Sequence, residues 1–168
     1  MKKVVKFGGS SLASAEQFRK VGEIIHSDSG RRYVVPSAPG KRYAEDTKVT
    51  DMLYDCYQTA NDERLLNEKL AAIAARYQEI IDGLSLEVSL KNQFEEIKEA
   101  FQGRAGSDYA ASRGEYLNGI IMAAYLGYEF VDAAEVIRFD EDGVYDADTT
   151  DKLLQKRLEG VERAVIPG

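Results

Sequence analysis

A short apolar segment that runs straight into two glycines constrains the fold more than any other feature of this chain. Residues 3–7 read KVVKF, a strand pattern, and Gly8-Gly9-Ser10-Ser11 follows at once. Ser14-Ala15-Glu16-Gln17 then matches a capping box, and apolar residues recur at helical spacing over residues 15–26. The pattern predicts a strand, a glycine turn and a helix.

This segment also has the chemistry of a phosphate-binding turn. Glycines let backbone N–H groups approach anionic oxygens, and the positive end of a helix favours negative charge. Lys6 adds a cation near the end of the strand. No GxxxxGK[ST] motif occurs, so the segment is not a P-loop. An ordinary strand-to-helix turn with a chance lysine is the alternative, and the residues alone leave both open.

The rest of the chain alternates strand and helix patterns. Two helices, at 62–82 and 86–101, are expected to form an antiparallel pair packed against the sheet. The alternation predicts an α/β fold with a mainly parallel sheet and helices on both faces. Further strands are expected at 33–36, 130–132, 136–139 and 164–166, and further helices at 50–60, 107–127 and 151–159, with Thr50 capping the first of these and Ser107 or Asp108 the second.

Several motifs, in order, resemble those of aspartate kinases in the amino-acid kinase family. The resemblance covers essentially the whole chain. It implies the N-terminal half of the amino-acid kinase fold, with the helical pair as an insertion near an oligomer contact. The matching segments are Lys6–Ser11 (KFGGSS), Val34–Ala38 (VVPSA), Val49–Leu53 (VTDML), Arg113–Leu117 (RGEYL), Gly127–Ala133 (GYEFVDA) and Ala164–Gly168 (AVIPG).

The resemblance implies an activity: transfer of the ATP γ-phosphoryl group to the side-chain carboxylate of L-aspartate, the first step toward lysine, threonine and methionine. Mg²⁺ would arrive with the nucleotide, and no protein ligands to it are assigned. A carboxylate is already ionised at neutral pH, so the reaction needs no general base. Catalysis then depends on positioning and charge stabilisation.

The resemblance also implies site residues. Lys6 and the N–H groups of Gly8, Gly9 and Ser10 would meet the transferred phosphoryl group. Ser37 and Thr50 would donate hydrogen bonds to substrate carboxylates, and Glu115 would pair with the substrate ammonium. Arg113 could bind a carboxylate or form a surface salt bridge, and Asp132 could orient Lys6 or cap the next turn.

Two departures from the family pattern affect these expectations. Residues 39–48, PGKRYAEDTK, are longer and more polar than the usual connection, so Thr47 and Thr50 compete for one role. The sequence also ends at Gly168, before the family's nucleotide-binding half and regulatory domains. We therefore expect residues 1–168 to be the acceptor-substrate part of a catalytic domain, inactive alone.

Composition excludes several other classes of function. A net charge of −7 without a basic run argues against nucleic acid binding. No apolar run approaches membrane length, and no signal peptide is expected. Cys56 is the only cysteine, which fits a reducing cytoplasm, and we expect it to be a buried helix residue. The acidic residues 140–148 lack calcium-loop spacing and are expected to form a solvated loop.

Three hypotheses follow from the sequence. The first is a catalytic fragment of an aspartate kinase, with L-aspartate and ATP as ligands, in a cytoplasmic homo-oligomer. The second is another amino-acid kinase of the superfamily. The third is a non-catalytic ligand-binding or assembly module.

Overall fold

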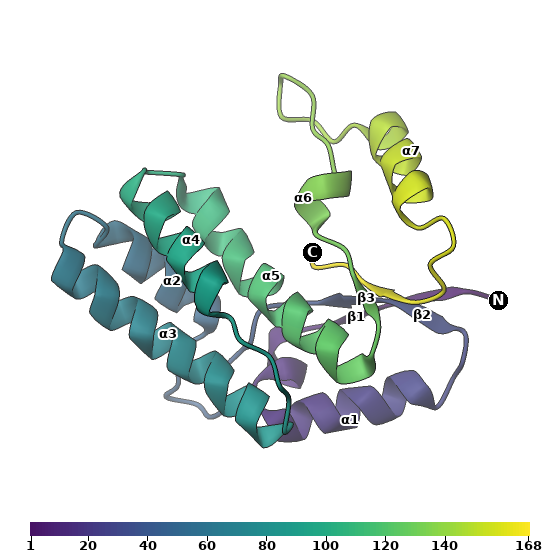
Figure 1. Ribbon diagram of the computed structural model, residues 1–168, viewed down its shortest axis with the longest axis horizontal. Helices are drawn as coiled ribbons and strands as arrows, with labels where there is room; N and C mark the ends of the chain where they lie inside the picture. The colour runs from purple at the N-terminus through teal and green to yellow at the C-terminus, as the bar shows by residue number, and fades with distance from the viewer.

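Four parallel strands form the sheet, in the order β1-β2-β4-β3 (Figure 1). The computed structural model describes residues 1–168. Its strands are β1 (Lys3–Phe7), β2 (Arg31–Pro36), β3 (Glu129–Phe130) and β4 (Ala164–Val165). All three pairings are parallel. The parallel α/β sheet predicted from the alternating pattern is therefore confirmed.

Helices cover both faces of this sheet, as expected. Val34 and Val165 belong to the main core together with residues of α1 and α5, whereas Ala164 belongs to a smaller core with Val136. Neighbouring strand residues point to opposite faces, so each face acquires its own apolar cluster. The helices are η1 (a 3-10 turn, Gly9–Leu12), α1 (Ala15–His26), α2 (Val49–Gln58), α3 (Glu63–Gly83), α4 (Lys91–Gln102), α5 (Ser107–Leu126), α6 (Ala133–Val136) and α7 (Ala147–Arg157).

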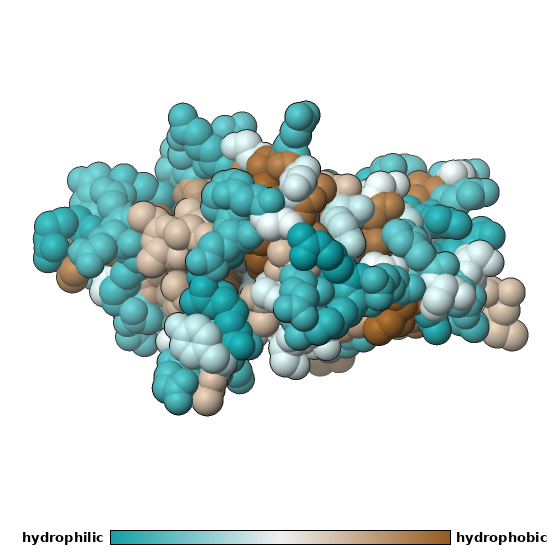
Figure 2. Space-filling view, turned by 90° about the horizontal axis from the view of Figure 1, so that it is seen from below, coloured by the Kyte–Doolittle hydropathy of each residue, from teal (hydrophilic) through white to brown (hydrophobic).

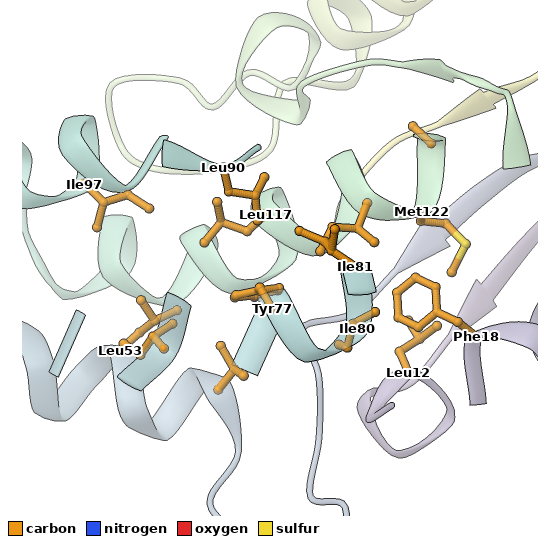
Figure 3. Packing of buried hydrophobic residues seen from close by; sticks show 14 of the residues in the cluster. Leu12, Phe18, Leu53, Tyr77, Ile80, Ile81, Leu90, Ile97, Leu117 and Met122 are labelled. Carbon is orange, nitrogen blue, oxygen red and sulfur yellow. The ribbon is translucent and has the colours of Figure 1, made fainter. Parts of the chain in front are cut away.

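The expected helical pair packs on other helices rather than on the sheet. Helix α4 runs back along α3, and the pair contacts α1, α2 and α5 (Figure 1). Tyr77 of α3 is fully buried in the same apolar cluster as Leu53 of α2 and Leu117 of α5 (Figure 3). Its hydroxyl donates a 2.7 Å hydrogen bond to the carbonyl of Gly114. The helical layer therefore extends sideways from the sheet and fixes α5 in place.

Local capping signals explain several helix ends. Ser14 accepts from the N–H of Gln17 and begins α1, as the capping box predicts. Gly127 ends α5 in the left-handed region at φ 67°. Two expected caps are wrong: Gly106 at φ 100° precedes α5, in place of Ser107 or Asp108, and Lys48 precedes α2, so that Thr50 lies in its first turn.

The strand predicted at 136–139 is wrong. Asp132 accepts a hydrogen bond from the N–H of Ala134 and caps α6, which takes Val136 into a helix. Phe139 meets Tyr145 only in an isolated antiparallel bridge. Between them Asp140 accepts from two backbone N–H groups and closes an exposed acidic loop. A local cap therefore overrides the apolar strand pattern.

A chain in which 30% of residues are charged is expected to have a largely hydrophilic surface. On the face shown in Figure 2, hydrophilic residues surround smaller hydrophobic areas. The helices all lack the combination of length and apolar character that crossing a membrane requires. Cys56 is buried in α2, as expected, and its burial raises the pKa of its thiol to about 11.

Candidate active site

The carboxyl ends of β1 and β2 bring two loops together. Phe7 lies opposite Pro36 in the register, and the N–H of Ser37 donates to the carbonyl of Phe7 at 3.0 Å. The N–H of Gly40 donates to the carbonyl of Gly9 at 2.8 Å. Ligands of parallel α/β sheets bind at this edge, so the glycine turn stands where a site is expected.

Two glycines let the backbones of these loops touch. A Cβ on Gly9 would lie 2.8 Å from the carbonyl oxygen of Ala38, and a Cβ on Gly40 would lie 2.6 Å from the carbonyl carbon of Gly9. Neither position has room for a side chain unless backbone moves. Gly9 and Gly40 are therefore required by the close approach of the two loops.

Gly8 differs from Gly9 in this respect. Its φ of −78° suits any residue, and a Cβ there would meet nothing within 4 Å. The N–H groups of Gly8, Gly9 and Ser10 donate to no other backbone group. The glycines lead into the short turn η1, which the sequence did not predict, and α1 follows it. Three free N–H groups on an open turn have the donor chemistry that suits an anion.

Helix α5 brings Glu115 to the same edge. A Cβ on Gly114 would lie 2.8 Å from the Cβ of Ala38 and 3.2 Å from a methyl of Leu53, so glycine lets α5 approach this closely. One turn later the side-chain amide of Asn118 donates to the carbonyl of Ser37 at 2.7 Å. Helix α5 is thus tied to the loop after β2.

These segments enclose a cleft of about 470 Å³. Five of the residues predicted from the sequence line it together, from four separate segments of the chain. Thr47 instead lines a neighbouring cavity with Arg42 and Asp46. The cleft is lined by Gly9, Ser10, Ser37, Ala38, Pro39, Gly40, Lys41, Lys48, Thr50 and Glu115.

Charge in the cleft is mostly positive, with one carboxylate. Burial raises the pKa of Glu115, and the nearby ammonium of Lys6 opposes that shift. Lys6 and Gly8 do not line the cleft itself, yet the charge of Lys6 reaches Glu115. Lys41 and Lys48 add two further cations to the wall. The arrangement suits a ligand with both anionic groups and an ammonium.

Two candidate residues lie outside this cleft. The guanidinium of Arg113 stacks between the rings of Tyr109 and Tyr116, 4.5 Å from each centroid. It forms no salt bridge, which was one of the two contacts considered for it from the sequence, and its hydrogen bonds go to Ser112. Asp132 caps α6, which is one of its two expected alternatives.

Asn118 and Gly40 were not among the residues predicted from the sequence. Asn118 is fully buried, and its side-chain oxygen has no hydrogen-bond partner. A polar residue inside the apolar run of α5 is the signal that could have identified it. Pro39-Gly40 signals a turn, but nothing local indicates its contact with Gly9. No three His, Cys, Asp or Glu residues cluster in a way that could hold a metal ion.

Comparison with known proteins gives relatives over most of the chain. Aspartokinase 3 of Bacillus subtilis (strain 168) is 41% identical over 140 residues, which is 80% of this chain and 31% of that protein. An aspartokinase of Chlamydia trachomatis is 30% identical over 149 residues, 82% of this chain and 32% of that protein. The chain therefore spans about a third of the length of these curated relatives.

Solved structures match the fold throughout. The crystal structure of Clostridium acetobutylicum aspartate kinase has a TM-score of 0.93 and 46% identity, covering 100% of this chain and 39% of that one. E. coli aspartokinase III, solved with aspartate and ADP, has a TM-score of 0.75 at 22% identity, covering 100% of this chain and 40% of that one; this likeness shows the fold alone. The sequence model of the amino acid kinase family matches residues 1–167, a range that contains the sheet, the helices and the cleft, so the chain belongs to the amino acid kinase family.

Proposed function

We propose that residues 1–168 form the acceptor-binding part of an aspartate kinase catalytic domain. The activity proposed is transfer of the γ-phosphoryl group of ATP to the side-chain carboxylate of L-aspartate, which forms 4-phospho-L-aspartate. The observation that carries this proposal is the cleft, where Ser37, Thr50 and Glu115 share a wall with Gly9 and Ser10. The nucleotide-binding half and the regulatory domains would lie outside residues 1–168.

Each group in or beside the cleft has a proposed role. Glu115, the only carboxylate there, pairs with the ammonium of aspartate, because half-burial strengthens such a pair relative to water. Ser37 and Thr50 donate their hydroxyls to the substrate carboxylates. Lys6 and the N–H groups of Gly8, Gly9 and Ser10 stabilise the negative charge on the transferred phosphoryl group.

The donor set near the glycine turn fits a phosphate. Three backbone N–H groups have no backbone partner, and a lysine precedes them on β1. ATP would supply the phosphoryl group and bring Mg²⁺ with it, while this chain holds the acceptor and stabilises charge on the phosphoryl group. E. coli aspartokinase III was solved with aspartate and ADP, which supports this pair of ligands for a shared fold.

Arg113 is left without a proposed contact to substrate. Its guanidinium is held by two tyrosine rings on α5. Cation–π stacking on both faces holds the guanidinium against that helix.

Titration of the ligands separately distinguishes the candidate functions. In isothermal titration, residues 1–168 should bind L-aspartate and bind ATP far more weakly. Preference for glutamate, acetylglutamate or a nucleoside monophosphate would instead indicate another amino-acid kinase. Binding of none of these ligands would leave an assembly role and contradict the proposal.

The choice between the two threonines has its own test. In the full-length gene product, Thr50→Val should raise KM for aspartate about tenfold, as loss of a hydrogen bond to a charged group does. Thr47→Val is the matched control, because Thr47 lines a neighbouring cavity rather than the cleft. A larger effect from Thr47→Val would contradict the assignment of Thr50.

A further inference from the structure

A buried arginine on α3 holds the loop that forms one wall of the cleft. Arg76 is only 5% exposed. Its Nη2 donates to the carbonyl oxygen of Gly40 at 2.8 Å and lies 3.5 Å from Oδ2 of Asp46. One guanidinium therefore joins both ends of the segment 40–46 to a rigid helix.

This segment belongs to the 40–48 loop, which supplies Gly40, Lys41 and Lys48 to the cleft. Within the loop, Arg42 binds Asp46 with two side-chain hydrogen bonds of 2.8 and 3.0 Å. Arg42 also reaches Oε2 of Glu79 on α3 at 2.7 Å. The loop is thus closed on itself and tied to α3 at two places.

The two ties differ in burial. Glu79 is 62% exposed, and ion pairs at that exposure contribute little. Arg76 and Asp46 are 5% and 8% exposed, so water screens them far less. The Arg76 contact is therefore the tie that fixes the position of the loop.

Stability alone does not explain a charge at this position. Nε and Nη1 of Arg76 are buried without a hydrogen-bond partner, and burial lowers the pKa of its guanidinium. A buried ion pair of this kind is often no more stabilising than a well-packed apolar side chain. The gain from Arg76 lies in the loop geometry that its contact with Gly40 imposes.

We propose that Arg76 is a positioning residue for the acceptor cleft, which acts by anchoring the 40–48 loop and never touches substrate. The proposal rests on the proposed function, since it assigns the cleft to the acceptor amino acid. Gly40 packs directly on Gly9 and Ser10. Release of the loop would therefore displace the wall next to the glycine turn.

The test compares variants of the full-length gene product. Arg76→Met should raise KM for aspartate by up to about tenfold to a hundredfold, because losing a charged hydrogen bond lowers the fraction of molecules with the loop in place, and KM for ATP should not change. KM for aspartate of Arg76→Lys should lie between those of the wild type and Arg76→Met, because an ammonium keeps the charge but cannot reproduce the paired donors of a guanidinium. Arg64→Met is the matched control, since Arg64 lies on α3 with its side chain 77% exposed.

A second measurement needs no catalytic activity. Trypsin should cut after Lys41, Arg42 and Lys48 faster in Arg76→Met than in the wild-type protein or Arg64→Met, because the loop is less restrained. Asp46→Asn removes the carboxylate partner of Arg76 on the loop and should likewise make trypsin cleavage of the loop faster. That variant keeps the test available if Arg76→Met does not fold.

The outcomes separate this inference from the proposed function. A wild-type protein that never phosphorylates aspartate overturns the proposed function, and the trypsin rates then decide whether Arg76 anchors the loop. Equal rises in KM for aspartate and ATP would indicate general loss of packing and overturn the inference. Unchanged KM for aspartate in an active Arg76→Met enzyme would overturn it as well.

Discussion

Lys6 and Glu115 are the two oppositely charged residues at the centre of the proposed chemistry. Lys6 is exposed on β1, whereas Glu115 is partly buried on α5. Their charges interact, because the ammonium of Lys6 opposes the rise in the pKa of Glu115 that burial causes. In the proposed function Lys6 faces the phosphoryl group and Glu115 faces the acceptor, so their substitutions should affect different kinetic constants.

Lys6→Ala should lower kcat of the full-length gene product with little change in KM for aspartate. Loss of one preorganised contact to transition-state charge typically costs roughly 3–4 kcal/mol, about a hundredfold to a thousandfold in rate. Steady-state kinetics measures the effect, and Lys20→Ala serves as control, because Lys20 pairs only with Glu16 on the surface of α1. Normal turnover by a folded Lys6→Ala enzyme would exclude Lys6 from the mechanism.

Glu115→Gln should have opposite effects on stability and on substrate binding. Because the pKa of Glu115 is raised in the folded state, ionisation of this carboxyl at neutral pH opposes folding. Glutamine carries no charge, so the variant should melt at a higher temperature than wild type at pH 7. The difference should shrink as pH falls from the raised pKa of folded Glu115 to the ordinary glutamate pKa, below which the carboxyl is protonated in both states.

The same variant should bind aspartate more weakly, since it no longer offers a charge to the ammonium. KM for aspartate should rise about tenfold or more, while KM for ATP should not change. Thermal melts from pH 4 to 7 and steady-state kinetics provide the two measurements. A stability difference that grows toward low pH would contradict the sign argued here.

At the scale of elements, the site depends on two loops that touch through their backbones. Gly9 and Gly40 have no room for a Cβ, whereas Gly8 has open space around it. Gly114 plays a similar part between α5 and the loop after β2. Glycine is thus needed at Gly9, Gly40 and Gly114 for packing within the protein itself.

Alanine substitutions at Gly8 and Gly9 distinguish a phosphate-binding turn from an ordinary strand-to-helix turn. Gly8→Ala should leave the melting temperature unchanged but lower kcat, because the new methyl group stands where the phosphoryl group would approach. Gly9→Ala should lower the melting temperature, because its Cβ collides with the backbone of Ala38. Normal kcat in Gly8→Ala would favour the ordinary strand-to-helix turn.

At the scale of the whole molecule, the proposed function makes the described residues one wall of a two-substrate site. The glycine turn and the acceptor cleft lie at the carboxyl edge of the sheet. The chain spans about a third of its curated relatives. On the proposed division of labour, contacts to adenine and ribose come from beyond residues 1–168.

Residues 1–168 expressed alone should therefore bind aspartate yet show negligible kinase activity. Activity should appear when the region that follows in the longer relatives is supplied in cis or in trans. A coupled assay for ADP release measures it, with the Glu115→Gln form as control for the binding step. A normal rate of aspartate phosphorylation by residues 1–168 alone would contradict the proposed domain assignment.

The sequence by itself determined the elements whose signals are local. β1 (Lys3–Phe7) and α1 (Ala15–His26) have the predicted bounds, because a capping box and helical periodicity act within a few residues. The alternation of strands and helices likewise sufficed to predict the parallel sheet. The resemblance to aspartate kinases singled out Ser37, Thr50 and Glu115 before any geometry was known.

Only the tertiary structure decided what depends on contacts between distant residues. The apposition of Gly9 and Gly40, the anchor from Arg76 to the 40–48 loop and the link from Asn118 to Ser37 join segments about 30 to 80 residues apart in sequence. The stacking of Arg113 between two tyrosines on its own helix depends on side-chain packing. Sequence patterns report local backbone preference, whereas a site forms where separate segments bury one another.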